Sequence, residues 1–174
     1  MSKHNIVTLI DVDKKKIERI NNKRAPIEDH SADGYWKWSD LNLTGMVGGA
    51  DSDKILSASD YIIIAVPTNL CKNTQRLDLH IIDSVLMKAY SLNNNALFII
   101  KSTVPIGYTD YICKRLHTSN VVFSPEFSRE SKSLYDTFFP SRIIVSYNNN
   151  NNIEKVQKFI EELKVFDKKI IICI

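Results

Sequence analysis

Three short apolar runs, each followed at once by polar residues, constrain this chain more than any other feature. Residues 61–66 read YIIIAV, residues 96–100 read ALFII, and residues 121–123 read VVF. Runs without polar alternation are typical of parallel strands that are buried on both faces of a sheet. Segments with helical character, at 77–92 and 107–117, separate these strands. The alternation predicts an α/β protein with a doubly wound parallel, Rossmann-like sheet.

The same alternation continues toward both ends of the chain. Asp13 is placed to cap a helix over 14–22, with Ile17 and Ile20 on one face. The glycines of 44–49 (TGMVGG) lack the G-x-G-x-x-G spacing of a dinucleotide loop, so a short edge strand or turn is expected there. Further strands are expected at 5–10, 141–145 and 169–174, and further helices at 51–59 and 153–163.

Composition and charge narrow the function classes. With 174 residues, 44% of them hydrophobic, the chain is large enough for one domain with a real core. The net charge of +3 is mild, and the basic run at 14–16 suits a solvated helix face better than a nucleic-acid surface. No apolar run approaches the ~20 residues of a membrane span, and the first residues show no leader pattern. Cys71, Cys113 and Cys173 have neither metal spacing nor a disulfide framework, which predicts a cytoplasmic setting.

Polar side chains follow two of the buried runs at the point where each run ends. Lys101, Ser102 and Thr103 follow the second run, and Glu126 lies in the loop after the third. Ligands of open α/β sheets bind outside the carboxyl ends of the strands, so both loops are candidate site segments. Simpler roles stay open, because the hydroxyls could satisfy backbone groups and Glu126 could cap a turn. Asp11 likewise could hold a ribose hydroxyl pair or form a turn.

Four segments carry a likeness to a known family. They are 58–68 (ASDYIIIAVPT), 101–107 (KSTVPIG), 123–130 (FSPEFSRE) and 140–145 (PSRIIV). In order and spacing they resemble the NAD-binding half of the UDP-glucose/GDP-mannose dehydrogenase family, and most of all its bacterial UDP-glucose 6-dehydrogenases. The resemblance implies an oxidoreductase with NAD as cofactor. The implied reaction is oxidation of UDP-glucose to UDP-glucuronate, which serves polysaccharide biosynthesis.

The resemblance also implies roles for single residues. Thr103 and Glu130 would be catalytic, with Thr103 holding a water and Glu130 reaching the cofactor or that water. A carboxylate suits this chemistry, because hydride loss from an alcohol needs a proton acceptor and thioester hydrolysis needs an activated water. The implied cofactor-binding residues are Asp11, Lys16, Pro67, Thr68, Ser102, Thr103 and Glu130. The implied substrate-binding residues are Glu126, Phe127, Ser128, Arg129 and Glu130.

Three departures from the family shape the expectations. The chain starts at about the family's second strand, so the first strand and the glycine-rich loop that holds the pyrophosphate are expected to be missing. The family's catalytic cysteine lies in a later domain, and no cysteine here has a matching context. Ser128 and Ser131 stand where leucine and glycine are usual. Residues 1–174 are therefore expected to form an incomplete NAD-binding domain, without the central helix and the cysteine domain.

A sheet without its central strand has to rearrange, or the fold has only marginal stability. One hypothesis is that strand 5–11 pairs directly with strand 61–66. The chain alone is expected to show no dehydrogenase activity and only weak NAD binding. The alternatives are a non-catalytic nucleotide-binding module, or half of a split enzyme that a second chain with the cysteine domain completes. Family members are usually homo-oligomeric, and neither a nucleic acid nor a membrane is expected as a partner.

Overall fold

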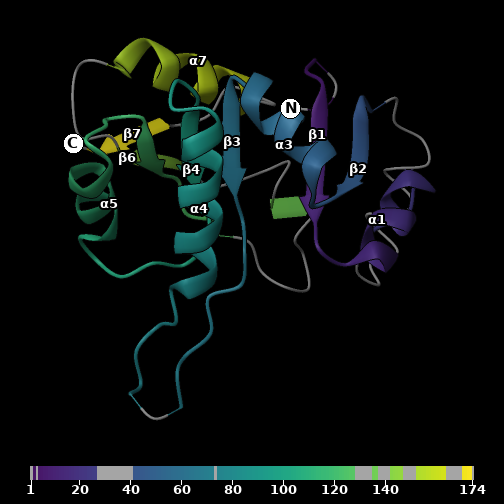
Figure 1. The fold of residues 1–174 in the computed structure, drawn as a ribbon. Helices are drawn as coiled ribbons and strands as arrows, with labels where there is room; N and C mark the ends of the chain where they lie inside the picture. The colour runs from purple at the N-terminus through teal and green to yellow at the C-terminus, as the bar shows by residue number, and fades with distance from the viewer. Residues whose placement is uncertain are drawn as a thin grey trace. The chain divides into compact units, whose positions relative to one another are not determined.

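Figure 1 shows the computed structural model of the chain, coloured from purple at the amino terminus to yellow at the carboxyl terminus. The structure describes residues 2, 4–26, 41–72, 74–127, 135–136, 142–146, 152–163 and 170–173. The chain divides into two compact units, Met1–Leu56 and Ser57–Ile174. No helix among the described residues has the length and apolar character that crossing a membrane requires.

The first unit contains a two-stranded parallel sheet. Strand β1 (Val7–Asp11) pairs with strand β2 (Leu43–Val47), and helix α1 (Lys14–Asn21) lies between them in sequence. Asp13 caps α1 as predicted, since its carboxylate accepts a hydrogen bond from the Lys15 N–H at 2.9 Å. Helix α3 (Ala50–Ala58) follows β2 and confirms the helix expected near 51–59.

Helix α1 packs on β2 through its buried face. Ile17 and Ile20 are 5% and 2% exposed, which confirms the face read from their spacing. Gly45 lies in β2 directly under this helix, and a Cβ atom there would come within 3.1 Å of the Ile20 Cγ2 atom. The glycine therefore permits a close approach of helix and strand that a side chain would obstruct.

The second unit is built on a five-stranded sheet in the order β3-β4-β5-β6-β7. Strands β3, β4 and β5 are mutually parallel, and a helix follows each of the first two. The elements are β3 (Tyr61–Ile64), α4 (His80–Leu92), β4 (Leu97–Ile100), α5 (Tyr108–Leu116), β5 (Val121–Phe123), β6 (Ile143–Ser146), α7 (Ile153–Leu163) and β7 (Ile170–Cys173).

Helices cover both faces of this sheet. Tyr61 of β3 is in register with Leu97 of β4, one position before Phe98, so Tyr61 and Phe98 face opposite sides. Phe159 of α7 packs on Tyr61 and Tyr90 of α4 packs on Phe98, each with ring centroids 5.8 Å apart. Every side chain of β4 is buried, as expected of a strand covered on both faces.

One expectation about the sheets is wrong. The sheet of the second unit is not parallel throughout, since β6 meets β5 antiparallel at Phe123 and Ser146. Strand β1 belongs to the first unit and strand β3 to the second, so the pairing of strand 5–11 with strand 61–66 stays a hypothesis.

One helix boundary also differs from the prediction. Apolar spacing places the start of α4 at Leu77, whereas the helix begins at His80. Leu77 instead forms an isolated antiparallel bridge with Leu70, and the Asp78 N–H donates to the Asn69 carbonyl at 2.7 Å. This pairing holds the segment before α4 in an extended conformation.

Candidate functional site

The ends of β3 and β4 are joined by one buried hydroxyl. Ser102 Oγ accepts a hydrogen bond from the Val66 N–H and donates one to the Val66 carbonyl, both at 2.8 Å. The Lys101 N–H donates to the Ile64 carbonyl at 2.9 Å, which extends the ladder past the end of β4. The Ser102 hydroxyl thus satisfies backbone groups, which is the simpler alternative to ligand binding. It also fixes the two strand ends to each other.

A shallow hollow of about 460 Å³ opens at these strand ends. Five of the predicted site residues line it, among them Thr68 after β3 and Thr103 after β4. Thr103 is exposed and Thr68 is half-buried, so both hydroxyls can reach a ligand. The hollow is lined by Ala65, Val66, Pro67, Thr68, Lys101, Ser102, Thr103 and Glu126.

Lys101 and Glu126 form an ion pair at the wall of the hollow. The Lys101 Nζ lies 2.8 Å from the Glu126 Oε2, with the two side chains 24% and 47% exposed. This contact links the loop after β4 to the loop after β5. The sequence placed Lys101 at the end of a strand but did not assign it a role. The available signal is a lysine and a carboxylate that follow two neighbouring strands of one sheet.

Of the other residues predicted to bind substrate in the loop after β5 (the glutamate loop, residues 124–130), only Phe127 belongs to the described residues. Phe127 is described, and the guanidinium carbon of Arg142 lies 5.2 Å from the centre of its ring. Ser128, Arg129 and Glu130 lie outside the described residues. The prediction that Glu130 acts with Thr103 in catalysis therefore remains a prediction.

Asp11 and Lys16 lie in the first unit, at the end of β1 and on the first turns of α1. Asp11 Oδ1 accepts from the Asp13 N–H at 2.9 Å, and Oδ2 lies 3.4 Å from the Lys16 Nζ. The Asp13 N–H, together with the nearby Lys16 charge, lowers the pKa of Asp11 below its ordinary value although partial burial opposes the shift. Asp11 is therefore an ionised acceptor, as a ribose-binding carboxylate has to be.

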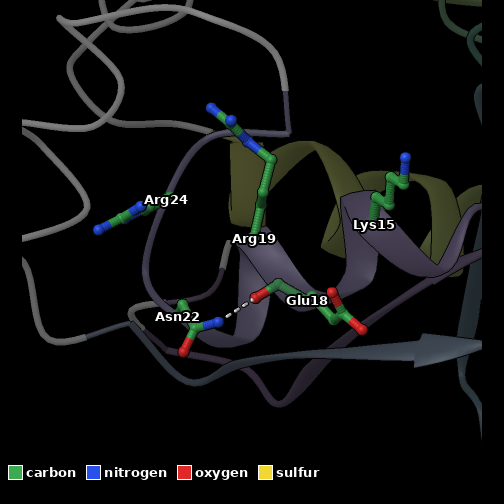
Figure 2. Close-up of a pocket in the computed structure, with 5 residues that line it drawn as sticks. All are labelled: Lys15, Glu18, Arg19, Asn22 and Arg24. Carbon is green, nitrogen blue, oxygen red and sulfur yellow. Dashed lines mark hydrogen bonds between the residues drawn. The ribbon is translucent and has the colours of Figure 1, made fainter.

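A second hollow, of about 570 Å³, lies along α1 and the residues after it. Figure 2 shows that the side chains of Lys15, Arg19 and Arg24 extend in different directions instead of converging on one point. The Arg19 Nε donates to the Ala25 carbonyl at 2.7 Å, and the Asn22 side chain donates to the Glu18 carbonyl at 2.8 Å. These contacts close the carboxyl end of the helix, and none of the predicted site residues lines this hollow.

A further contact stiffens the loop that carries Thr103. The hydroxyl of Tyr108, the first residue of α5, donates to the Asp83 carboxylate in the first turn of α4 at 2.5 Å. Burial, and then the bond to Asp83, raise the pKa of Tyr108 well above its ordinary range. The starts of α4 and α5 are thereby fixed to each other beside the strand ends.

Among the described residues, no group of three or more potential metal ligands is brought together.

Comparison with known proteins gives a consistent result. The model of the UDP-glucose/GDP-mannose dehydrogenase family, NAD binding domain, matches residues 1–164. The UDP-glucose 6-dehydrogenase of Streptococcus pneumoniae is 37% identical over 145 residues, which cover 83% of this chain and 36% of that protein. The UDP-glucose 6-dehydrogenase of Campylobacter jejuni subsp. jejuni is 38% identical over 141 residues, which cover 81% and 35%. The chain thus spans little more than one third of the length of these relatives.

Solved structures agree on the fold. A GDP-mannose dehydrogenase from Pseudomonas aeruginosa superposes with a TM-score of 0.80 at 23% identity, covering 98% of this chain and 41% of that chain. A UDP-D-ManNAc dehydrogenase from Pyrococcus horikoshii gives a TM-score of 0.82 at 20% identity, covering 99% and 42%. The parallel strands alternating with helices are therefore a Rossmann-like NAD-binding fold.

Proposed function

Because the chain belongs to the UDP-glucose/GDP-mannose dehydrogenase family, through that family's NAD-binding domain, we propose that it supplies the NAD-binding part of a nucleotide-sugar dehydrogenase. The observation that carries this proposal is the hollow at the ends of β3 and β4. Ser102 joins these ends through Val66, and the hydroxyls of Thr68 and Thr103 lie on the same hollow. Ligands of open α/β sheets bind at this position.

The adenosine end of the cofactor is assigned to the first unit. The Asp11 carboxylate accepts the ribose hydroxyls, and the hydrogen bond from the Asp13 N–H, together with the Lys16 charge, keeps it ionised and oriented. A carboxylate that is already held by two donors loses less conformational freedom when the ribose binds. Pro67, Thr68 and Thr103 line the other end of the dinucleotide, while Ser102 acts by fixing the strand ends.

The reacting end of the sugar is assigned to the glutamate loop. Residues 126–130 contact the nucleotide sugar, with Glu126 on the hollow wall beside Thr103. Thr103 holds the water, and Glu130 reaches the cofactor or that water. A carboxylate near the reacting alcohol accepts the proton that is released as hydride leaves, and a hydroxyl orients the water used in a later hydrolysis. NAD, when bound, accepts the hydride.

UDP-glucose is the proposed substrate, because the sequence relatives with the highest identity reported above are UDP-glucose 6-dehydrogenases. The proposed reaction of the whole enzyme is its oxidation to UDP-glucuronate. The chain spans little more than one third of those relatives, and the isolated chain is proposed to bind without turnover. NADH formation by the isolated chain with UDP-glucose would contradict this part of the proposal.

Calorimetric titration of the chain with NAD tests the binding assignment. Wild-type chain is expected to bind, and the Asp11→Asn variant is expected to bind about tenfold more weakly, because a hydrogen bond to a charged group is lost. Asp51→Asn is the matched control, since Asp51 is an exposed carboxylate of the same unit paired with Lys54. The proposal fails if NAD produces no saturable heat, or if both variants bind as wild type does.

A further inference from the structure

The backbone ladder ends just before Glu126. The last backbone tie from this loop to β4 is the Ser124 N–H, which donates to the Ile100 carbonyl at 2.9 Å. Pro125 follows and has no N–H to donate. Among the described residues, the recorded partner of the Glu126 side chain is Lys101. The direction of the Glu126 carboxylate therefore depends on a side-chain contact and not on the sheet.

Lys101 is well placed to determine that direction. Its backbone N–H is held on the Ile64 carbonyl at 2.9 Å, and it directly follows β4, whose four side chains are all buried. The base of the Lys101 side chain is therefore part of the rigid sheet. Its ammonium lies 2.8 Å from the Glu126 carboxylate with only 24% of the side chain exposed, so the contact is partly shielded from water.

Phe127, the next residue of the loop, is contacted from the β6 side of β5. The Arg142 guanidinium lies over the Phe127 ring at 5.2 Å, a distance at which a cation and an aromatic face attract. Arg142 directly precedes β6, which pairs with β5. Two successive loop residues are thus contacted by two cations, one extending from β4 and one from β6.

We propose that Lys101 and Arg142 are positioning residues, which hold Glu126 and Phe127 from two sides and keep the Glu126 carboxylate at the hollow. The inference rests on the proposed function for the identity of the ligand, UDP-glucose. The positioning itself concerns the ligand-free chain and can be measured there. Arg142 acts by orienting the aromatic residue, and Lys101 acts by orienting the carboxylate.

The experiment measures amide ¹⁵N relaxation at Glu126 and Phe127 in the ligand-free chain, together with the affinity for UDP-glucose. The variants are Lys101→Met and Arg142→Met, which replace the cation with an uncharged, unbranched and shorter side chain. Lys101→Arg tests rescue by a retained cation. Lys114→Met, at an exposed lysine on α5, is the matched control. Lys101→Met and Arg142→Met are each expected to increase fast motion at both amides and to weaken UDP-glucose binding about two- to fivefold.

A double substitution separates positioning from direct ligand contact. If Lys101 acts through Glu126, Lys101→Met has little further effect on UDP-glucose affinity in a Glu126→Gln background. If the same two- to fivefold loss of affinity persists in that background, Lys101 touches the ligand itself and the positioning role is overturned. Unchanged amide relaxation at Glu126 and Phe127 in both charge-removing variants would overturn it as well. Absence of UDP-glucose binding by wild type would contradict the proposed function alone, because the relaxation measurement does not need the ligand.

Discussion

Asn21 and Gly45 exchange two hydrogen bonds between the last residue of α1 and the middle of β2. The Asn21 side-chain nitrogen donates to the Gly45 carbonyl at 3.0 Å, and the Gly45 N–H donates to the Asn21 side-chain oxygen at 2.7 Å. A side-chain amide thus pairs with β2 as another strand would. This contact holds the carboxyl end of α1 on the two-stranded sheet.

Gly45→Ala is expected to destabilise the chain by about 1–3 kcal/mol, the usual cost of inserting atoms into a packed contact. The new Cβ would lie 3.1 Å from both the Asn21 Oδ1 and the Ile20 Cγ2. Gly48→Ala is the control, because a Cβ there meets only the Ile10 Cγ2 at 3.9 Å. Urea unfolding of both variants measures the difference, and equal midpoints would refute the close-packing argument.

Ser102→Ala is expected to lower the free energy of unfolding by about 1–3 kcal/mol, because it leaves the Val66 N–H without its acceptor. Thr103→Ala changes the neighbouring hydroxyl, which is exposed, and is expected to alter stability by less than about 0.5 kcal/mol. Urea unfolding again provides the measurement. If the two substitutions cost the same, the Ser102 hydroxyl does not fix the strand ends.

Tyr108→Phe tests the contact between α4 and α5, and the measurement is folding stability at alkaline pH. A pKa raised in the folded state means that the fold favours the neutral phenol, so the contribution is complete below the ordinary value of 10.0 and is lost as the pH rises above it. Wild-type stability is therefore expected to fall more steeply above pH 10 than that of Tyr108→Phe. Some fall remains in the variant, because the pKa of Tyr61 is raised too. Alkaline slopes that are equal in wild type and in Tyr108→Phe would refute the role of this contact.

The lowered pKa of Asp11 predicts a loss of folding stability at acid pH. Its pKa is lowered in the folded state, so its contribution is complete above the ordinary value of 3.8 and is lost as the pH falls below it. Thermal unfolding between pH 6 and pH 3 is expected to show a smaller acid loss in Asp11→Asn than in wild type. Identical acid limbs would mean that the hydrogen bond from the Asp13 N–H does not hold this carboxylate.

Local sequence signals predicted most of the elements, because local chemistry decides them. The buried strands appear where uninterrupted apolar runs occur, and the Asp13 cap and the buried face of α1 follow from short-range spacing. The hollow was also foreseeable, since parallel strands bring their polar carboxyl ends to one edge of a sheet. Thr68 and Thr103 accordingly line it together.

The remaining features depend on pairings between distant segments, which periodicity does not encode. The antiparallel contact of Phe123 with Ser146 is one example, because strand direction is decided by the connection and not by the strand's own residues. The start of α4 is another, since Leu77 follows a helical period yet pairs with Leu70. The Lys101–Glu126 ion pair belongs here as well, because the choice of side-chain partner is made in three dimensions.

The strand ends joined by Ser102 are proposed to form the dinucleotide site. An NMR titration of ¹⁵N-labelled chain with NAD tests this most directly, because each amide reports separately. Saturable shift changes are expected at Thr68 and Thr103. A well-dispersed spectrum in which NAD leaves Thr68 and Thr103 unmoved would contradict it.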